Sequence, residues 1–188
     1  MKTCCALLQV LLACLSCGCA ATQQRVDTTV ERFRFAPETE PYFQSAAGYA
    51  VFPTIGKAGA GIGGAHGKGA VYRGGAKVGE VELNQLSAGF QLGGQTFSEI
   101  LFFEDERALR EFCSGNFELE ASASAVALAI GASASLGTAG ANASRSLDQE
   151  AELASSYYKG MAIFTIAKSG IMYEVSLAGQ VFSGDCQL

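Results

Sequence analysis

Hydrophobic and polar residues alternate with a period of two along much of the chain, which is the pattern of β-strands. Short apolar runs of this kind occupy residues 49–52, 77–83, 86–92 and 96–103. Just before the second run, Arg73-Gly-Gly-Ala76 has the composition of a tight hairpin turn. Many short strands with a few short helices predict a mainly β, or α+β, fold. We expect antiparallel twisted sheets that form a barrel- or sandwich-like domain.

The carboxyl-terminal part of the chain carries the strongest hairpin signal. Residues 161–167 and 171–177 are apolar runs, and Lys168-Ser-Gly170 between them predicts a turn. Residues 117–130 alternate small polar and apolar side chains, as a long strand does. The small and weakly charged residues 131–146 fit either a strand or a loop, and the sequence leaves both open.

Three other segments have features of helices. Residues 41–48 begin with proline and end with glycine, which suits the first turn and the stop of a helix. Residues 104–112 begin with acidic side chains, which complement the positive end of the helix dipole. Residues 22–34 are mostly polar but carry apolar side chains at helical spacing. This last segment is predicted to be either a tether or a short helix.

Glycine occupies every second position in two stretches, at 59, 61 and 63 and again at 67 and 69. Glycine weakens a strand unless another part of the molecule must lie close to it, so we expect close backbone packing here. Residues 59–64 also match the dinucleotide-binding pattern GxGxxG, but the next glycines disfavour the helix that this site requires. Lys68 is followed by glycine rather than serine or threonine, which excludes a P-loop.

The first nineteen residues have the features of a secretory signal peptide. Lys2 precedes an apolar run that ends near Leu15, and small residues and cysteines follow it. The run is shorter than the roughly 20 apolar residues of a membrane-spanning helix. Cleavage just before a cysteine is typical of bacterial lipoproteins, in which acyl chains such as palmitate are then attached. The alternative is an ordinary secretory signal that ends near Ala21.

Cys19 is the favoured lipidation site, because cleavage before it leaves the longest apolar core; Cys17 and Cys14 are the alternatives. Two or more acyl chains would anchor the protein stably in a membrane. We therefore predict a signal peptide at 1–18, a lipidated amino terminus and tether at 19–36, and one binding domain at 37–188. The expected location is the bacterial cell envelope, on the periplasmic face of the outer membrane.

Composition narrows the classes of function. The chain has 188 residues and a net charge of −5, so its overall charge does not favour nucleic acid. Only Cys113 and Cys186 lie outside the leader, and in an oxidising compartment they could form one disulfide, which the sequence leaves open. With His66 as the single histidine, these two cysteines cannot complete a four-ligand zinc site, and we predict no metal and no cofactor.

The sequence offers no set of catalytic residues. His66 has no neighbouring nucleophile motif such as GxSxG, and it fits a surface loop better than a general base. Glu118 and Glu120 lie two apart on a predicted strand and so share one face, which fits a solvated surface better than a cation site. We expect a protein that is not an enzyme.

Charge is distributed unevenly along the domain. No acidic residue occurs between Glu40 and Glu80, and this interval holds four cations: Lys57, Lys68, Arg73 and Lys77. Basic side chains on glycine-rich segments suit phosphate groups, because backbone amides and cations can both approach them closely. The alternative is that the four side chains point in different directions and only make the sheet more soluble.

Several blocks occur in the order found in one family. They are Gly48-Tyr-Ala-Val-Phe-Pro53, Lys57-Ala-Gly-Ala-Gly-Ile-Gly-Gly64, Gly89-Phe-Gln-Leu-Gly-Gly-Gln95, Phe97-Ser-Glu-Ile-Leu-Phe-Phe103 and Gly160-Met-Ala-Ile-Phe164. Together they resemble the SYLF (Ysc84-type) lipid-binding domain over about residues 38–183.

The resemblance implies a mainly β domain that binds anionic phospholipids. It carries a headgroup-contact role to Lys57, which stands in the first glycine-rich block, whereas the roles of the other three cations rest on local charge alone. Eukaryotic members often have a basic amphipathic segment before the domain, but here acidic residues at 27 and 31 dilute the basic ones. The expected partners are anionic phospholipids, a membrane held through the acyl anchor and, as the alternative, an envelope protein bound by a scaffold lipoprotein.

Overall fold

The computed structural model describes residues 22–114, 116–119, 128–130, 157 and 159–188. Its elements are α2 (Glu40–Ser45), β1 (Gly48–Arg73), β2 (Ala76–Phe103), α3 (Glu106–Phe112), β3 (Asn116–Leu119), β4 (Leu128–Ile130) and β5 (Met161–Cys186). Residues 22–34 form a further helix, called the amino-terminal helix below. The described strands form one open sheet in the order β1-β2-β5-β3, and β4 pairs with β5. All pairs except β4–β5 are antiparallel, which confirms the predicted mainly β fold.

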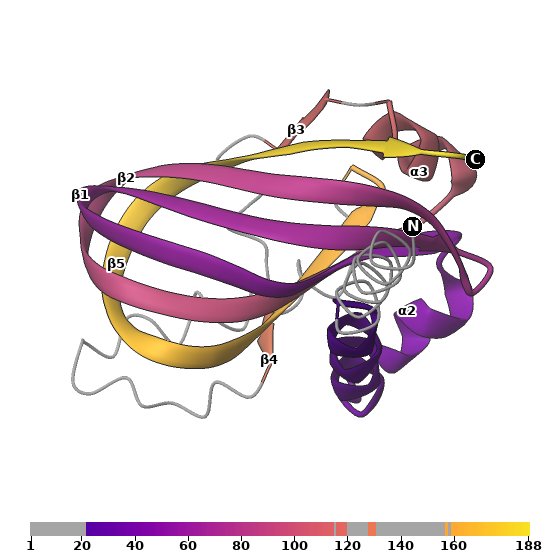
Figure 1. Cartoon of the computed structure of the whole chain (residues 1–188), viewed down its shortest axis with the longest axis horizontal. Coiled ribbons are helices and arrows are strands. Elements are labelled where there is room, and N and C mark those ends of the chain that lie inside the picture. Colours follow the sequence, from indigo (N-terminus) through magenta and orange to yellow (C-terminus); the bar gives the residue numbers. More distant parts are fainter. Residues whose placement is uncertain (1–21, 115, 120–127, 131–156, 158) are drawn as a thin grey trace, which may run out of the picture.

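The sheet is built from three very long strands that bend and fold it over on itself (Figure 1). β1, β2 and β5 each contain 26 to 28 residues, so the runs predicted as separate strands at 86–92 and 96–103 belong to one strand. The amino-terminal half of β1 lies against its own carboxyl-terminal half, because a Cβ at Gly48 would be 2.5 Å from the carbonyl oxygen of Tyr72. The result is a sandwich-like body of two layers.

The hairpin predicted at residues 168–170 is wrong. β5 runs through this position without turning and stays paired with β2 on both sides of it. Thr96 pairs with Ser169 and Phe97 pairs with Ala167, so Lys168 is an extra residue in β5. Residues 168–170 therefore mark a β-bulge and not a turn. Both structures interrupt an apolar run with a few polar or glycine residues. By contrast, the hairpin turn predicted at 73–76 is confirmed, since Arg73 pairs with Ala76.

The alternating glycines allow the two halves of β1 to approach each other. A Cβ at Gly67 would lie 2.6 Å from a side-chain carbon of Ile55, and one at Gly69 would lie 2.6 Å from the carbonyl oxygen of Val51. Real side chains do not tolerate such distances, so this face of the strand must be bare. The close packing expected from the glycine pattern is therefore present, and its partner is another part of the same strand.

The inner face of the folded sheet carries the larger hydrophobic core. Its fully buried members come from both layers and include Phe52, Ile55, Leu83, Leu101 and Phe103. α3 closes one end of this core with Leu109 and Phe112. The helix predicted at 104–112 is thus confirmed as Glu106–Phe112, and it begins where the Asp105 side chain accepts a hydrogen bond from the Ala108 amide at 2.7 Å.

The outer face of the sheet is covered near β1 by the amino-terminal helix and α2. Val26 and Phe33 from the helix and Tyr42 from α2 pack on Val51 and Phe102 of the sheet. The sequence is compatible with a tether or a helix at residues 22–34. The structure has a helix there, and it packs on the domain. The helix predicted at 41–48 is confirmed as α2.

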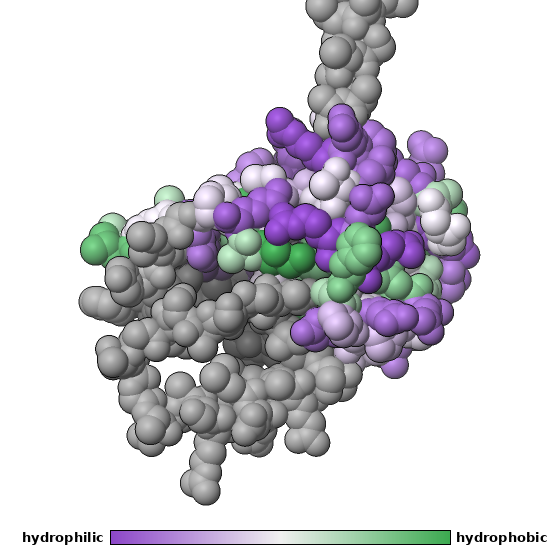
Figure 2. Space-filling model, turned by 90° about the horizontal axis from the view of Figure 1, so that it is seen from below, coloured by the Kyte–Doolittle hydropathy of each residue, from purple (hydrophilic) through white to green (hydrophobic). Residues whose placement is uncertain are grey.

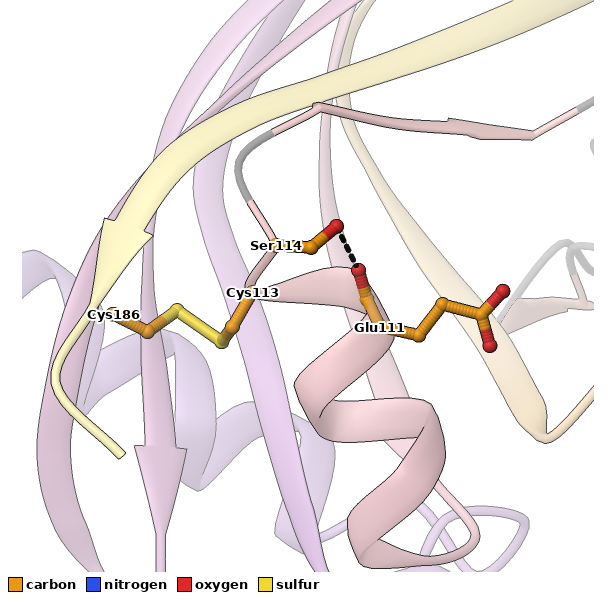
Figure 3. Close-up of a disulfide and its surroundings, with 4 residues drawn as sticks. All are labelled: Glu111, Cys113, Ser114 and Cys186. Carbon is orange, nitrogen blue, oxygen red and sulfur yellow. Dashed lines mark hydrogen bonds between the residues drawn. A yellow bond between two sulfur atoms is a disulfide. The ribbon is translucent and has the colours of Figure 1, made fainter.

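Cys113 and Cys186 are joined by a disulfide, with their Cα atoms 5.5 Å apart (Figure 3). The bridge ties the end of α3 to the end of β5 across 73 residues of chain. Next to it, Ser114 donates a hydrogen bond from Oγ to the carbonyl oxygen of Glu111 at 2.8 Å. The bridge left open by the sequence is therefore present in the fold.

Several predictions fall outside the described residues. They include the signal peptide, the lipidation sites Cys14, Cys17 and Cys19, and the segment 131–146. Of the long strand predicted at 117–130, only the backbone of β3 and β4 at its two ends is described. The three predicted segments 1–18, 19–36 and 37–188 stay predictions.

Candidate functional site

Two of the four predicted cations lie together but are already paired with acids. Lys68 lies 2.9 Å from a carboxylate oxygen of Glu82, and Lys77 lies 2.8 Å from one of Glu80. Both lysines border one hollow of about 460 Å³, which the amino-terminal helix also lines. Each lysine lowers the pKa of its partner carboxyl group by hydrogen bonding and charge. Their charge is largely compensated within the protein.

The other two predicted cations lie elsewhere. Arg73 donates from Nε to Glu106 of α3 at 2.8 Å, at the β1–β2 hairpin. Lys57 is only 9% exposed and lines a cavity of about 590 Å³ between the two halves of β1. The structure therefore brings together Lys68 and Lys77 but places Lys57 and Arg73 apart from them.

The sequence did contain a signal for this pairing. Glu80 and Glu82 follow immediately after the interval without acidic residues. In an antiparallel hairpin that turns at 74–75 they return beside the basic positions, and the register places Lys68 directly opposite Glu82. The interval without acids hides both pairs, because Glu82 reaches Lys68 across the strand pairing and Glu80 follows Lys77 by three residues on β2.

A different group of cations gathers between the amino-terminal helix and β5. Arg25 and Arg32 of the helix and Lys168 of the β5 bulge line a groove of about 350 Å³. Gln24, Thr28 and Thr29 complete its lining. We call this set the basic groove. The bulge positions Lys168, whose ammonium group donates to the carbonyl oxygen of Pro53 and to Thr54 Oγ1, the latter at 3.1 Å.

The electrostatics of the basic groove favour an anion. Burial lowers the pKa of Lys168, and the charges of Arg32 and Arg25 lower it further. None of the described residues that line the groove is acidic, and among the described residues no ion pair is made by either arginine. Positive charges that repel one another in this way are stabilised by a bound negative group.

The acidic residues of the amino-terminal helix lie away from the basic groove. Residues 25 and 32 are seven positions apart and share a flank, whereas 27 and 31 fall on the other side of the buried stripe. Asp27 accepts instead from Gln23 at 2.8 Å, and Gln23 also donates to Tyr72. The acids therefore do not dilute the basic flank, in contrast to the prediction from charge along the chain.

The chemistry of the basic groove suits an oxygen anion such as a phosphate. Arginine guanidinium groups present forked donors that match phosphate oxygens, and the lysine adds a point charge. The sequence spacing of the two arginines could have indicated half of this site. Lys168 could not be found in the same way, because its segment was predicted to be a turn.

A second polar group missed by the sequence lies inside the folded sheet. Glu99, Gln85, Ser87 and Gln180 are buried on the inner face among apolar side chains. Burial raises the pKa of Glu99 to about 7, although the hydrogen bond from Gln180 and the charge of Lys57 lower it. We call these four residues the inner polar cluster. Glu99 there keeps its proton up to near-neutral pH.

The remaining predictions concern metal ligands, His66 and the pair Glu118 and Glu120. No group of three or more metal-ligating side chains occurs among the described residues. His66 is exposed and shares a 2.9 Å hydrogen bond with Asn84 on the next strand. The side chains of Glu118 and Glu120 are outside the described residues. Within the described ranges, no helix has the length and apolar character needed to cross a bilayer.

Comparison with known proteins identifies the family. The sequence profile of the Ysc84 family, described as Las17-binding protein actin regulator, matches residues 84–187. The chain belongs to the Ysc84 family. The Ysc84 (SYLF) domain is known as a lipid-binding and actin-regulator domain. The match includes most of β2 and all of α3 and β5, so Lys168 and Glu99 lie within it and the amino-terminal helix lies before it.

The comparison with curated proteins and the comparison with solved structures find no match to the chain. The resemblance stated from the sequence blocks is confirmed by the family match alone. A finer function for this Ysc84 protein therefore has to be argued from its own residues.

Proposed function

We propose that this protein binds the headgroups of anionic phospholipids in the basic groove, without catalysis. The single observation that carries the proposal is the meeting of Arg25, Arg32 and Lys168 in one groove whose described lining has no acid. Membership of a lipid-binding family supports the same chemistry. The earlier candidates Lys68 and Lys77 are weaker, since each has an acidic partner within 3 Å.

The proposal includes an acyl anchor at Cys19, or at Cys17 or Cys14. Such an anchor would hold the domain on the periplasmic face of a bacterial outer membrane. It would also raise the effective concentration of headgroups near the groove, so that each individual contact can be weak. The intact mass of membrane-extracted protein tests this part separately, because it reports both the cleavage site and the acylation.

Binding of this kind is electrostatic. Each basic side chain near an anionic membrane contributes about 1 kcal/mol, so three cations supply about 3 kcal/mol. Counter-ions screen such contacts over about 10 Å at 0.1 M salt, and binding therefore weakens as salt is added.

Vesicle flotation tests the proposal. The sample is the full chain carrying Cys14→Ser, Cys17→Ser and Cys19→Ser, called the anchor-free chain, so that acylation cannot hold it on a membrane. We expect it to float with vesicles containing phosphatidylglycerol and to stay behind with pure phosphatidylcholine. Equal flotation with both at low salt would reject the proposal.

A pair of variants links the flotation to the basic groove. Arg25→Glu with Arg32→Glu reverses two exposed charges of the groove and should abolish flotation. Arg107→Glu with Arg110→Glu makes the same change in net charge on α3, where both side chains are 66–70% exposed. The α3 variant should float like the unchanged protein, and equal losses in both variants would mean that only net charge matters.

The second candidate is a scaffold lipoprotein that binds a protein partner. The family description supports it, because it names binding to another protein, Las17. Charge reversal at Lys68 and Lys77, which border one hollow, would then abolish capture of the partner and leave vesicle binding unchanged.

A further inference from the structure

Three large aliphatic side chains are exposed where the long strands bend. Ile62 of β1 is 74% exposed, and Leu86 and Leu92 of β2 are 76% and 63% exposed. Single exposed apolar residues are common on proteins, but a group of neighbours is not. These three form a group, as the pairing of the two strands shows.

The strand register places the three residues around one irregular point of the β1–β2 pairing. Ile62 pairs with Ala88, so Leu86 is its diagonal neighbour two positions along β2. Leu92 pairs with Ala60, which is two positions before Ile62 on β1. Ile62 and Leu86 are therefore diagonal neighbours of a regular sheet, with Cα atoms about 7–8 Å apart. Leu92 lies beyond the register shift between Ala60 and Ile62, where β2 bulges. We call Ile62, Leu86 and Leu92 the apolar bend.

The surroundings of the apolar bend on β1 and β2 carry no charge. From 58 to 67 β1 contains only glycine, alanine, Ile62 and His66, and from 83 to 98 β2 contains no acidic or basic residue. β5 contributes Glu174 to the register opposite Gln91, so the uncharged area ends at that strand. Figure 2 shows a small group of hydrophobic residues at the left end of the molecule, and further hydrophobic residues in the middle of the face beside hydrophilic ones.

We propose that the apolar bend inserts into the interfacial layer of the bilayer whose headgroups the basic groove binds. This inference rests on the proposed function and adds a second, apolar contact to it. An uncharged segment can leave water at a small cost in hydration free energy, because no charge has to be dehydrated. Burial of each exposed aliphatic side chain in the bilayer is favourable.

The position of the apolar bend relative to the basic groove supports a bilayer as the occupant. Leu92 lies four positions before Thr96 on β2, and Thr96 pairs with Ser169 next to Lys168. Four residues of strand separate these rows, which is at most about 13 Å because β2 bends at 93–94. A membrane offers anionic headgroup oxygens and hydrocarbon within such a distance. The basic groove and the apolar bend can therefore both contact the same bilayer.

A second copy of the chain fits the apolar bend less well. A stable interface buries about 800 Å² on each partner, whereas three aliphatic side chains offer at most a few hundred. The glycine-rich segment of β1 around Ile62 also offers a protein partner few side chains to contact. The bilayer needs no matching shape.

The absence of tryptophan from the chain gives a direct test. Leu86→Trp in the anchor-free chain introduces a single fluorophore at the apolar bend, and Leu188→Trp introduces one at the carboxyl terminus, where Leu188 is 47% exposed. Phosphatidylglycerol-containing vesicles should shift the emission of Leu86→Trp to the blue. Lipids brominated on their acyl chains should quench it, and Leu188→Trp should show neither effect.

The outcomes separate this inference from the proposed function. Vesicle binding without a blue shift or quenching at Leu86→Trp would overturn insertion and leave headgroup binding intact. Failure of both proteins to bind anionic vesicles would overturn the two proposals together. Equal blue shifts at Leu86→Trp and Leu188→Trp would also contradict insertion, since the effect would not be specific to the bend.

A polar replacement provides an independent measure. Ile62→Ser, Leu86→Ser and Leu92→Ser combined should weaken binding to anionic vesicles at least tenfold, because all three exposed side chains lose their apolar contact. Leu188→Ser is the matched control and should change binding less than twofold. Unchanged binding in the triple variant would overturn the inference. Binding of the triple variant to vesicles that the unchanged protein does not bind would overturn it as well.

Discussion

Gln180 donates a hydrogen bond from Nε2 to the buried carboxylate oxygen Oε2 of Glu99 at 3.3 Å. The contact joins β5 to β2 across the inner face of the sheet, where Glu99 is 1% exposed. The same amide group lies 3.4 Å from Gln85 Oε1. Oε1 of Glu99 has no hydrogen-bond partner among the described residues. One long hydrogen bond does not offset the burial of a negative charge, so the protonated acid is the stable form.

The first prediction is that stability falls as pH rises through the titration of Glu99. Its pKa is raised to about 7 in the folded protein, from about 4.3 in an unfolded chain. The folded state therefore holds the proton more tightly than the unfolded chain. The contribution of Glu99 to stability is fully present below about pH 4.3 and is lost as the pH rises to about 7. The decrease should be about 4 kcal/mol. Urea unfolding across this range measures it.

Glu99→Gln isolates this contribution from other titrations. The variant keeps the shape and the polarity of the side chain but has no proton to lose. We expect the difference in unfolding free energy between variant and unchanged protein to grow in favour of the variant from pH 4.5 to pH 8. A difference that stays constant over this range would show that Glu99 titrates normally.

The second prediction concerns the disulfide between Cys113 and Cys186. Closing a loop of 73 residues restricts the unfolded chain by about 4 kcal/mol in the chain-entropy description. Cys113→Ser with Cys186→Ser should lower the free energy of unfolding by about 2–4 kcal/mol. Reduction should destabilise the unchanged protein equally and leave the double variant unaffected. An unfolding midpoint of the unchanged protein that does not shift on reduction would contradict the prediction.

The third prediction tests the close approach of the two halves of β1. Gly69→Ala places a Cβ 2.7 Å from the ring of Phe52 and should destabilise the fold by about 1–3 kcal/mol. Gly56→Ala is the matched control, because a Cβ there meets no atom within 4 Å. Chemical denaturation of both variants measures the difference. Equal effects would mean that the halves of β1 do not need a bare surface.

The fold class followed from the sequence because it depends on local patterns. Alternation of apolar residues predicted strands, and the glycines at 67 and 69 indicated a close approach. The length of the strands did not follow, because glycine at 93–94 marks a bend and a turn equally well. The same ambiguity produced the wrong hairpin around Lys168, where an extra residue forms a bulge.

The candidate site was harder to predict than the fold. Lys68 has no acidic residue near it along the sequence, because Glu82 reaches it only through strand pairing. The basic groove joins residues more than 130 positions apart, and local charge cannot reveal such a contact. Arg25 and Arg32 could be placed on one flank from helical spacing, but the segment was equally compatible with a tether.

The affinity of the anchor-free chain for phosphatidylglycerol-containing vesicles, measured by titration at low salt beside the Lys168→Glu variant, tests the central claim most directly. Reversal of one charge in the basic groove should cost about 2 kcal/mol, or about thirtyfold in affinity. Arg110→Glu on α3 should change the affinity less than threefold, and pure phosphatidylcholine should bind none of the proteins. Equal affinities of Lys168→Glu and Arg110→Glu, or equal binding to both lipids, would contradict the account.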